Sequence, residues 1–436
     1  MKRRTIWMMG SILMVMSAVA FIIAGCRGGG GGGGVGGGGA KTVLVRTYRR
    51  TQIASPNFIA FQDGNGQWQI AQGSGGQYTF TINDPNGRYG LAIVFVTHWP
   101  DGVTEVEVNI LHATVSELSE INLVTEEFPA ANLVTVSGTV SGLGIGEGAI
   151  IAMDMDDDEP SFSRNTYSLD VPPGTYDLVA VKGSLAQVGP IAVNKMLIQR
   201  NVIVPGNTTI NVDFNDPNAF VPETRNAVIG GVLSGEYVNG FVRFLSHNKT
   251  EITVGERFGG SSFSFTPVPT NKQLENDIHY LNAIATTDTT IRLIERYFKA
   301  PMDISATLPS PFGNASVTVG VPPPPYTRFT ASWDAYSGAQ AYFARFISVT
   351  GRAVSWFVGL SAGWLGGQTS YTLPDLSGLS GWDNNWGFPS SGLVDWEVGA
   401  VKTNRPIQDY VNAKFVPTDG LEVSIAGKRG RSTITP

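Results

Sequence analysis

The sequence predicts an all-β protein built from β-sandwich domains in tandem. Apolar and polar residues alternate on both sides of short proline- and glycine-rich turns, at residues 84–87 and again at 172–174. Such alternation across a turn is typical of β-hairpins. Both places also share one pattern: Tyr-x-apolar-x-apolar, a turn, and then Gly-x-Tyr-x-Leu. The recurrence indicates that one sandwich unit is used more than once.

Residues 41–125 are expected to form the first sandwich, with strands at 78–82 and 89–96. The second of these strands is apolar at nearly every position, so we expect it to be central in a sheet with both faces covered. Residues 130–215 repeat this plan, with strands at 167–171 and 176–180.

Residues 226–320 are expected to form a third sandwich by analogy with the two preceding units. Residues 281–285 fit a strand. The segment 291–298 fits a strand and also a short helix, because Ile291, Ile294 and Phe298 have helical spacing. The strand is favoured here.

Three segments of the second region resemble the carboxypeptidase regulatory-like (transthyretin-like) family. They are VSGTV at 136–140, YSLDVPPGTYDLVAV at 167–181, and TTINVDF at 208–214. The resemblance implies a small structural β-sandwich, and the family has no catalytic residues to transfer to this chain.

Residues 326–436 follow a stiff spacer of four prolines and resemble a fibronectin type III domain. The resemblance places Trp333 in strand B, Tyr342 in strand C, residues 369–376 at strand E and residues 396–401 at strand F. Two features depart from the family. Trp396 stands at the place of the usual corner tyrosine, and an insertion runs from 377 to 392.

The chain opens with Lys2, Arg3 and Arg4, and an apolar stretch follows up to residue 24. This is the pattern of a secretory leader. The tetrapeptide Ile23-Ala24-Gly25-Cys26 resembles a bacterial lipobox, which implies that residues 1–25 are a signal peptide and that the Cys26 thiol is diacylated. An uncleaved membrane anchor is the alternative, with the same topology. Residues 26–40 are mostly glycine and are expected to be a flexible tether.

Composition narrows the class of protein further. Cys26 is the only cysteine, so the folded region is expected to contain no disulfide. Without the three basic residues of the leader, 27 basic and 36 acidic residues give a net charge of −9, which argues against a nucleic-acid partner.

The sequence Gly359-Leu-Ser361-Ala-Gly363 matches the nucleophile elbow G-x-S-x-G. An elbow needs a following helix and a later histidine. We expect no helix after Ser361, and all four histidines precede it in the chain: His98, His112, His247 and His279. No two of these histidines have the sequence spacing of metal ligands, so no zinc site is predicted. Neither catalysis nor a cofactor is expected.

Two loops are candidate binding sites. The acidic run around Asp154, Asp156 and Asp158 offers carboxylates for Ca²⁺, although a solvated acidic loop is favoured because the EF-hand positions are not met. The second candidate lies in the 377–392 insertion and consists of five consecutive residues: Trp382, Asp383, Asn384, Asn385 and Trp386. Its indoles are suited to stacking on a sugar or peptide, or alternatively to capping the end of the sandwich.

These features predict a cell-surface lipoprotein that acts as a non-catalytic adhesion, binding or envelope-scaffolding module. The expected partners are the membrane, through the lipid on Cys26, and a carbohydrate or envelope protein. The alternative is an envelope-associated hydrolase or its carbohydrate-binding accessory protein. A concave pocket with convergent titratable groups would favour the enzyme.

Overall fold

The computed structural model describes residues 41–99, 102–125, 132–184, 192–320, 325–413 and 418–435. This part is nearly all β, which confirms the predicted fold class. Its helical segments are short: α2 (Ala362–Leu365), α3 (Ile407–Val411), η2 (Thr270–Lys272) and η3 (Asn384–Trp386). No described helix has the length and apolar character needed to cross a bilayer. The predicted leader, Cys26 and the tether lie outside the described residues.

The first two groups of strands are named unit 1 and unit 2. Unit 1 contains β1 (Lys41–Arg49), β2 (Gln52–Ile53), β3 (Phe58–Asp63), β4 (Trp68–Ile70), β5 (Gly73–Ser74), β6 (Gln77–Ile82), β7 (Arg88–His98), β8 (Thr104–Thr114) and β9 (Glu120–Thr125). Unit 2 contains β10 (Val134–Ser141), β11 (Glu147–Met153), β12 (Asp156–Asp158), β13 (Thr166–Val171), β14 (Gly174–Ser184), β15 (Ala192–Val204), β16 (Thr208–Thr209) and β17 (Val212–Asp213).

The other two groups are unit 3 and unit 4. Unit 3 contains β18 (Arg225–Gly230), β19 (Tyr237–Leu245), β20 (Glu251–Phe258), β21 (Ser262–Phe265), β22 (Ile278–Thr286), β23 (Thr290–Phe298) and β24 (Ile304–Thr307). Unit 4 contains β25 (Ala315–Val319), β26 (Phe329–Trp333), β27 (Ala341–Ser348), β28 (Ala353–Ser361), β29 (Ser370–Thr372), β30 (Gly392–Thr403) and β31 (Glu422–Ile434).

Units 1, 2 and 3 share one topology. In each, the first strand pairs antiparallel with a middle strand and parallel with the last, giving β6-β1-β9, β13-β10-β16/β17 and β21-β18-β24. Each faces a four-stranded set, ordered β4-β3-β7-β8, β12-β11-β14-β15 and β20-β19-β22-β23. The internal repeat predicted from two hairpins therefore extends to a third unit.

The strands expected at 281–285 and 291–298 are confirmed as β22 and β23. Eight of the nine residues of β22 pair with residues of β23, from His279–Phe298 to Thr286–Ile291. Apolar residues occupy both faces of β23, because both faces are covered. That double burial removes the two-residue period and leaves a pattern that also fits a helix.

Unit 4 has a different strand order, in which the sheet β25-β26-β29 faces β31-β30-β27-β28. Trp333 on β26 and Tyr342 on β27 stack with ring centroids 5.4 Å apart, in the strands expected for them. Trp396 lies on β30, and its indole packs so closely on Gly430 that a Cβ there would be 2.4 Å away. β25 falls within the range predicted for the third sandwich, 226–320, yet it pairs with β26 and belongs to unit 4.

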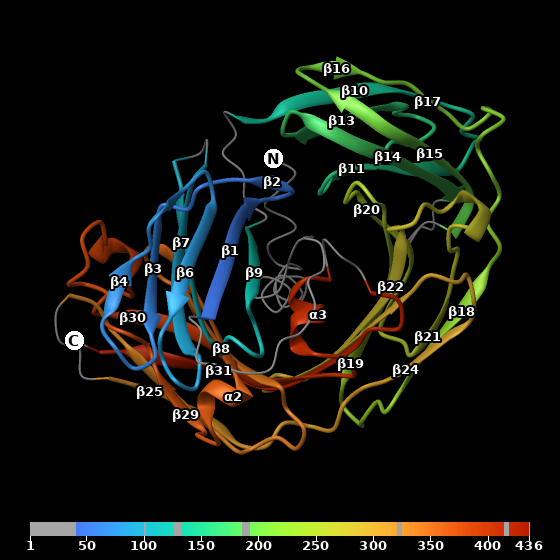
Figure 1. The fold of residues 1–436 in the computed structure, drawn as a ribbon. Helices are drawn as coiled ribbons and strands as arrows, with labels where there is room; N and C mark the ends of the chain where they lie inside the picture. The colour runs from blue at the N-terminus through green and yellow to red at the C-terminus, as the bar shows by residue number, and fades with distance from the viewer. Residues whose placement is uncertain are drawn as a thin grey trace.

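The four-stranded sheets of units 3, 4 and 1 join edge to edge into one sheet of twelve strands. β23 of unit 3 pairs antiparallel with β31, and β28 pairs parallel with β8 of unit 1. Unit 4 thus lies between units 1 and 3 in the sheet. Unit 2 also contacts unit 1 and unit 3, on the side opposite unit 4. The four units form a closed circle around α3 (Figure 1).

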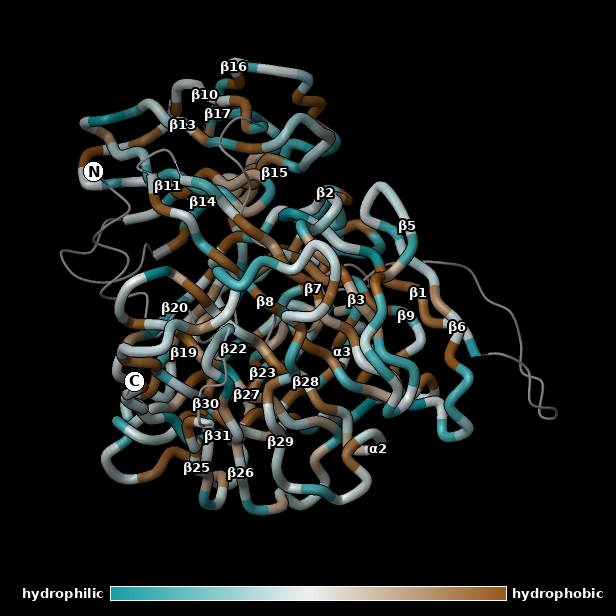
Figure 2. Tube along the Cα trace, turned by 90° about the vertical axis from the view of Figure 1, so that its left-hand side faces the viewer, coloured by the Kyte–Doolittle hydropathy of each residue, from teal (hydrophilic) through white to brown (hydrophobic). Residues whose placement is uncertain are grey.

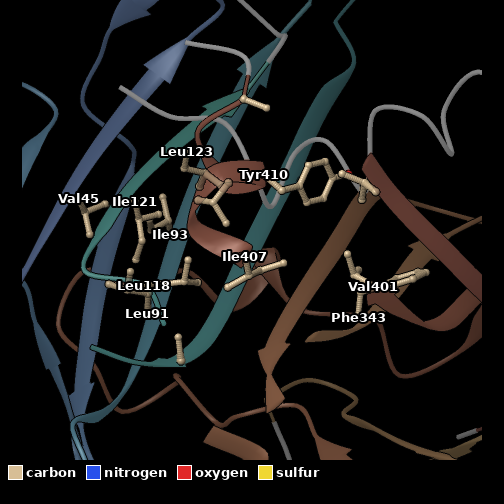
Figure 3. Packing of buried hydrophobic residues seen from close by; sticks show 14 of the residues in the cluster. Val45, Leu91, Ile93, Leu118, Ile121, Leu123, Phe343, Val401, Ile407 and Tyr410 are labelled. Carbon is tan, nitrogen blue, oxygen red and sulfur yellow. The ribbon is translucent and has the colours of Figure 1, made fainter. Parts of the chain in front are cut away.

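One hydrophobic core extends through units 1, 3 and 4. Ile407 and Tyr410 of α3 fill the space between unit 1 residues such as Ile121 and unit 4 residues such as Phe343 (Figure 3). β7 is covered on both faces, since Leu91 belongs to this core and its neighbour Ala92 belongs to the unit 4 core. Hydrophobic residues follow the central strands, and the surrounding turns are more hydrophilic (Figure 2).

The shared core predicts that units 1, 3 and 4 unfold together. Phe343→Ala should lower the free energy of unfolding by about 3–5 kcal/mol, because it removes a large buried side chain from the common core. Calorimetry and denaturant melts should show one shifted transition for the three units. Ile145→Ala is the control, since this side chain is 90% exposed and should change stability by less than about 0.5 kcal/mol. Separate transitions for units 1 and 4 would contradict the shared core.

Candidate functional site

One group of charged side chains joins unit 2 to unit 3. Asp177 of β14 and Arg200 of β15 meet His247 and Asp277, which lie in loops of unit 3. Both carboxylates are fully buried. The Arg200 Nη1 atom lies 2.8 Å from Asp177 Oδ2 and 3.1 Å from Asp277 Oδ1, and its Nη2 atom pairs with Asp277 Oδ2. We call these four residues the ionic junction.

Further donors satisfy the remaining acceptor positions of the two carboxylates. Asp177 Oδ1 accepts hydrogen bonds from the Asn201 backbone N–H at 3.0 Å and the Asn248 amide at 3.1 Å. Asp277 accepts from the backbone N–H groups of His247 at 2.7 Å and Leu274 at 2.8 Å. Burial alone would raise the pKa of Asp177, but the Asn201 N–H and the Arg200 guanidinium outweigh it and lower that pKa.

The ionic junction also resembles a metal site in its geometry. Ligand atoms of Asp177, His247 and Asp277 lie within 4.8 Å of one another, the one such group among the described residues. The Arg200 Nη1 atom, however, is within hydrogen-bond distance of both carboxylates, in the position that a shared cation would take. The guanidinium therefore supplies the positive charge between the two carboxylates. The ionic junction thus links unit 2 to unit 3 by ion pairs.

Asp154 joins three units at once. Its Oδ1 accepts from Thr51 Oγ1 at 2.9 Å, and its Oδ2 lies 3.6 Å from the guanidinium of Arg50, both in unit 1. Its backbone N–H donates to Thr250 Oγ1 at 3.0 Å, and its carbonyl accepts from Glu251 N–H at 3.3 Å, both in unit 3. The residue is fully buried and has a left-handed φ of 56°, so surrounding contacts hold it in an uncommon conformation.

The predicted Ca²⁺ ligands do not converge. Asp156 Oδ2 accepts from the Asp170 backbone N–H at 2.6 Å, and Asp158 pairs with Arg164 at 2.8 Å. Asp154 turns instead to unit 1. Residues 156–158 form a strand, β12, rather than a loop. The three carboxylates serve three different partners in the structure, and Ca²⁺ binding at Asp154, Asp156 and Asp158 stays a prediction.

The predicted binding loop packs its two indoles against unit 1. Trp382 and Trp386 make edge contacts with Phe58, at ring-centroid distances of 5.5 and 5.8 Å. The Trp356 indole also donates to the Trp386 carbonyl at 3.0 Å. Both indoles are half-buried, which agrees with the capping alternative. The three polar residues between them, Asp383, Asn384 and Asn385, are exposed, and ligand binding there stays a prediction.

The expectation that no helix follows Ser361 is wrong, because α2 begins directly after it. The Ser361 hydroxyl accepts from Trp364 N–H at 3.2 Å and caps the helix, and Gly366 ends it with a φ of +58°. The same hydroxyl donates to Glu117 Oε2 at 2.6 Å. Ser361 is thus bound to a carboxylate of unit 1 and fastens unit 4 to it.

His112 lies on β8, beside Leu360 of β28. Its Nε2 is 2.8 Å from the Tyr371 hydroxyl, and its ring packs on Trp364 with centroids 4.2 Å apart. Burial lowers the pKa of His112 to about 3, so the ring is neutral at physiological pH. This histidine therefore fills an aromatic interface between units 1 and 4.

An open groove of about 300 Å³ runs along β20 and β21. Phe263, Phe265 and Val254 form its apolar lining, and Glu256 and Arg257 are its ionisable residues. The lining contains no nucleophile paired with a base. The two apolar cavities beside β8 are far smaller, at about 20 and 10 Å³. None of these spaces has the convergent titratable groups that would favour an enzyme.

No family model and no curated protein sequence matches this chain. Among solved structures, a tetra-tandem repeat from the extending region of a large adhesion protein is similar with 10% identity and a TM-score of 0.16, covering 91% of this chain and 100% of that one. The FN1–FN3 domains of chicken CNTN1 are similar with 11% identity and a TM-score of 0.15, covering 58% of this chain and 83% of that one. At such TM-scores the likeness carries no argument, and the fold assignment rests on the strand order above.

The carboxyl of Glu295 predicts a pH dependence of stability. Burial raises its pKa to about 7, against an ordinary value of 4.5, although Asn282 donates to it at 2.8 Å. The folded protein thus loses stability as pH rises from about 4.5 to about 7. Glu295→Gln should therefore raise the free energy of unfolding at pH 8 by about 2–3 kcal/mol and change it little at pH 4.

Glu236→Gln is the control variant for this measurement, because the pKa of Glu236 is shifted in the opposite direction. Burial raises the pKa of Glu236, but its ion pair with Arg292 outweighs burial and lowers that pKa. Its substitution should destabilise the protein at pH 8, and thermal melts at both pH values would check both signs. Equal effects of Glu295→Gln at pH 4 and pH 8 would contradict the raised pKa.

Proposed function

We propose that the protein is a non-catalytic surface module for adhesion or envelope scaffolding, held to the membrane by lipid on Cys26. The observation that carries the proposal is the twelve-stranded sheet shared by units 1, 3 and 4. Strand pairing between units makes a rigid body, because each junction contains many backbone hydrogen bonds. Rigidity of this kind suits a spacer or a binding scaffold on the cell surface.

The chemistry-bearing residues support the same function. Ser361, His112 and Asp154 match reactive or ligating residue types, yet each contacts a neighbouring unit. We propose that these contacts hold the units together, and the hydrolase is the alternative that the binding experiment below also tests.

We further propose that the ligand is a carbohydrate or an envelope protein, and that its contact is the exposed polar stretch 383–385 in unit 4. Binding residues are frequent on loops that a rigid scaffold positions. The half-buried indoles on either side fix the ends of this stretch, so it is presented in one conformation. Unit 2, with its carboxypeptidase regulatory-like segments, acts structurally in this proposal.

Binding is tested on cells that display the full-length protein. Asn384→Ala should weaken capture of a glycan or envelope-protein array severalfold without changing the melting temperature, because the side chain is exposed. Ser390→Ala in the same insertion is the matched control. Unchanged capture by Asn384→Ala and by the double variant Asn384→Ala/Asn385→Ala would rule out this loop, and release of products from envelope polysaccharide would favour the hydrolase.

Anchoring is tested separately. Cys26→Ala should abolish labelling by a fatty-acid analogue and leave the precursor uncleaved, because the thiol is the acylated group in the lipobox family. Ser17→Ala in the same leader is the control and should be labelled normally. Full labelling of the Cys26→Ala protein would exclude lipidation at this residue.

A further inference from the structure

We propose that the groove along β20 and β21 binds an extended peptide segment of another protein, which adds as a further strand to the free edge of β20. The peptide is recognised by its main chain and by apolar side chains at alternate positions. The groove belongs to unit 3, whereas the stretch 383–385 belongs to unit 4. The inference is therefore a second binding site, and its test is separate from that of the proposed function.

β20 is the last strand of the twelve-stranded sheet, and no strand among the residues that the structure describes pairs with its second edge. The Gly259 N–H donates to the Val238 carbonyl at 2.8 Å, just beyond the pair Phe258–Asn239. In an antiparallel pair, hydrogen-bonded residues alternate with residues whose main-chain groups point away from the partner strand. The N–H and C=O groups of Glu256 and Phe258 therefore point away from β19, toward the free edge.

The groove lies directly beside this edge, where β20 and β21 separate. The Thr266 N–H donates to the Val254 carbonyl at 3.0 Å and joins the two strands at one end. They are still close at Gly255, since a Cβ there would be 2.4 Å from the Phe265 Cβ. From Gly255 onward both strands line the open space of about 300 Å³, which Val193 of unit 2 also lines. Main-chain groups and an apolar groove thus meet at one place.

The face of β20 that looks into the groove indicates which side chains the added strand carries. Arg257 pairs with Gly240, and the missing Cβ of Gly240 leaves room for the Phe263 ring, so Arg257 is on the groove face. Phe263 is half-buried and Arg257 is exposed. A strand paired with β20 places every second side chain on this face. Apolar side chains at those positions cover Phe263, and an acidic one faces Arg257.

The contacts inside this chain indicate that the occupant is a peptide. β31 pairs with β23 at the opposite edge of unit 3, and β28 pairs with β8 of unit 1. A strand on β20 continues the same series of edge-to-edge joints along one sheet. Main-chain groups repeated along an edge match another main chain, whereas a sugar ring has no such repeat. A peptide is therefore the occupant that satisfies both the edge and the groove.

Peptide selection on the full-length protein in detergent tests the proposal. The probe is a phage library of random twelve-residue peptides, and peptides from enriched clones are synthesised and titrated. Enriched sequences should have apolar residues at alternate positions and an acidic residue on the same face. Glu256→Pro should weaken their binding about three- to tenfold, because proline removes the outward N–H. Edge strands tolerate proline where the N–H faces outward, so the fold is retained.

Two protein variants are the controls. Glu256→Ala retains the main-chain N–H and should bind the peptides as the wild type does, and its melting temperature should be close to that of Glu256→Pro. Asn384→Ala, in unit 4, should also bind them normally, which separates this site from the one proposed above.

N-methylation of the peptide gives a readout in which the protein is unchanged. Methyl groups on one alternate set of peptide amides should abolish binding, and methyl groups on the other set should have little effect, because only every second amide pairs with β20. The absence of enriched peptides, equal binding by Glu256→Pro and Glu256→Ala, or equal effects of both methylated sets would overturn the proposal. Capture of a glycan array that is lost in Glu256→Pro would also overturn it, in favour of a carbohydrate.

Discussion

Strand pairing between units is the interaction on which the rest of this structure depends. β31 joins β23 along seven residue pairs from Thr290–Lys428 to Arg296–Glu422, and β28 joins β8 along eight pairs from Ala353–Glu105 to Leu360–His112. An unpaired strand edge invites association with other chains. Unit 4 covers the corresponding edge of unit 1 and of unit 3, so the chain uses its own last unit to remove two such edges.

The fused sheet also decides where apolar residues occur. Because small sheets, α3 and neighbouring units cover both of its faces, its strands are apolar at successive positions. All nine residues of β22 are buried, and seven of the nine in β23 are. The polar residues that remain in these strands must find partners inside the protein, as Asn282 and Glu295 do. Double burial thus explains both the ambiguous sequence pattern of unit 3 and its buried carboxyl.

Local pattern predicted most of the elements, because hairpins record their turns and their alternation in adjacent residues. Strands of unit 4 were expected from a resemblance carried by local segments such as that around Trp333. The pairing of β28 with β8 could not be predicted from local sequence. Any sequence can form backbone hydrogen bonds, and these two strands lie far apart in the chain. The partners of the candidate site residues left no record in the sequence for the same reason. Asp154 looked like one of a cluster of metal ligands, but its partners Arg50 and Thr250 come from other units. The ionic junction joins residues between 177 and 277, and no spacing in the sequence marks it.

Unit 2 differs from its sister units in how it is held. The edge of β15 corresponds to the edges of β8 and β23, yet in the described residues it carries one isolated bridge, Met196–Phe220, in place of a neighbouring strand. Its junctions with units 1 and 3 consist of charged side chains, short polar contacts and an apolar face. Backbone pairing uses groups that do not titrate, whereas the junctions of unit 2 contain buried carboxylates of Asp154, Asp177 and Asp277. The same repeated fold therefore yields a three-unit sheet joined by backbone pairing and one unit docked through side chains.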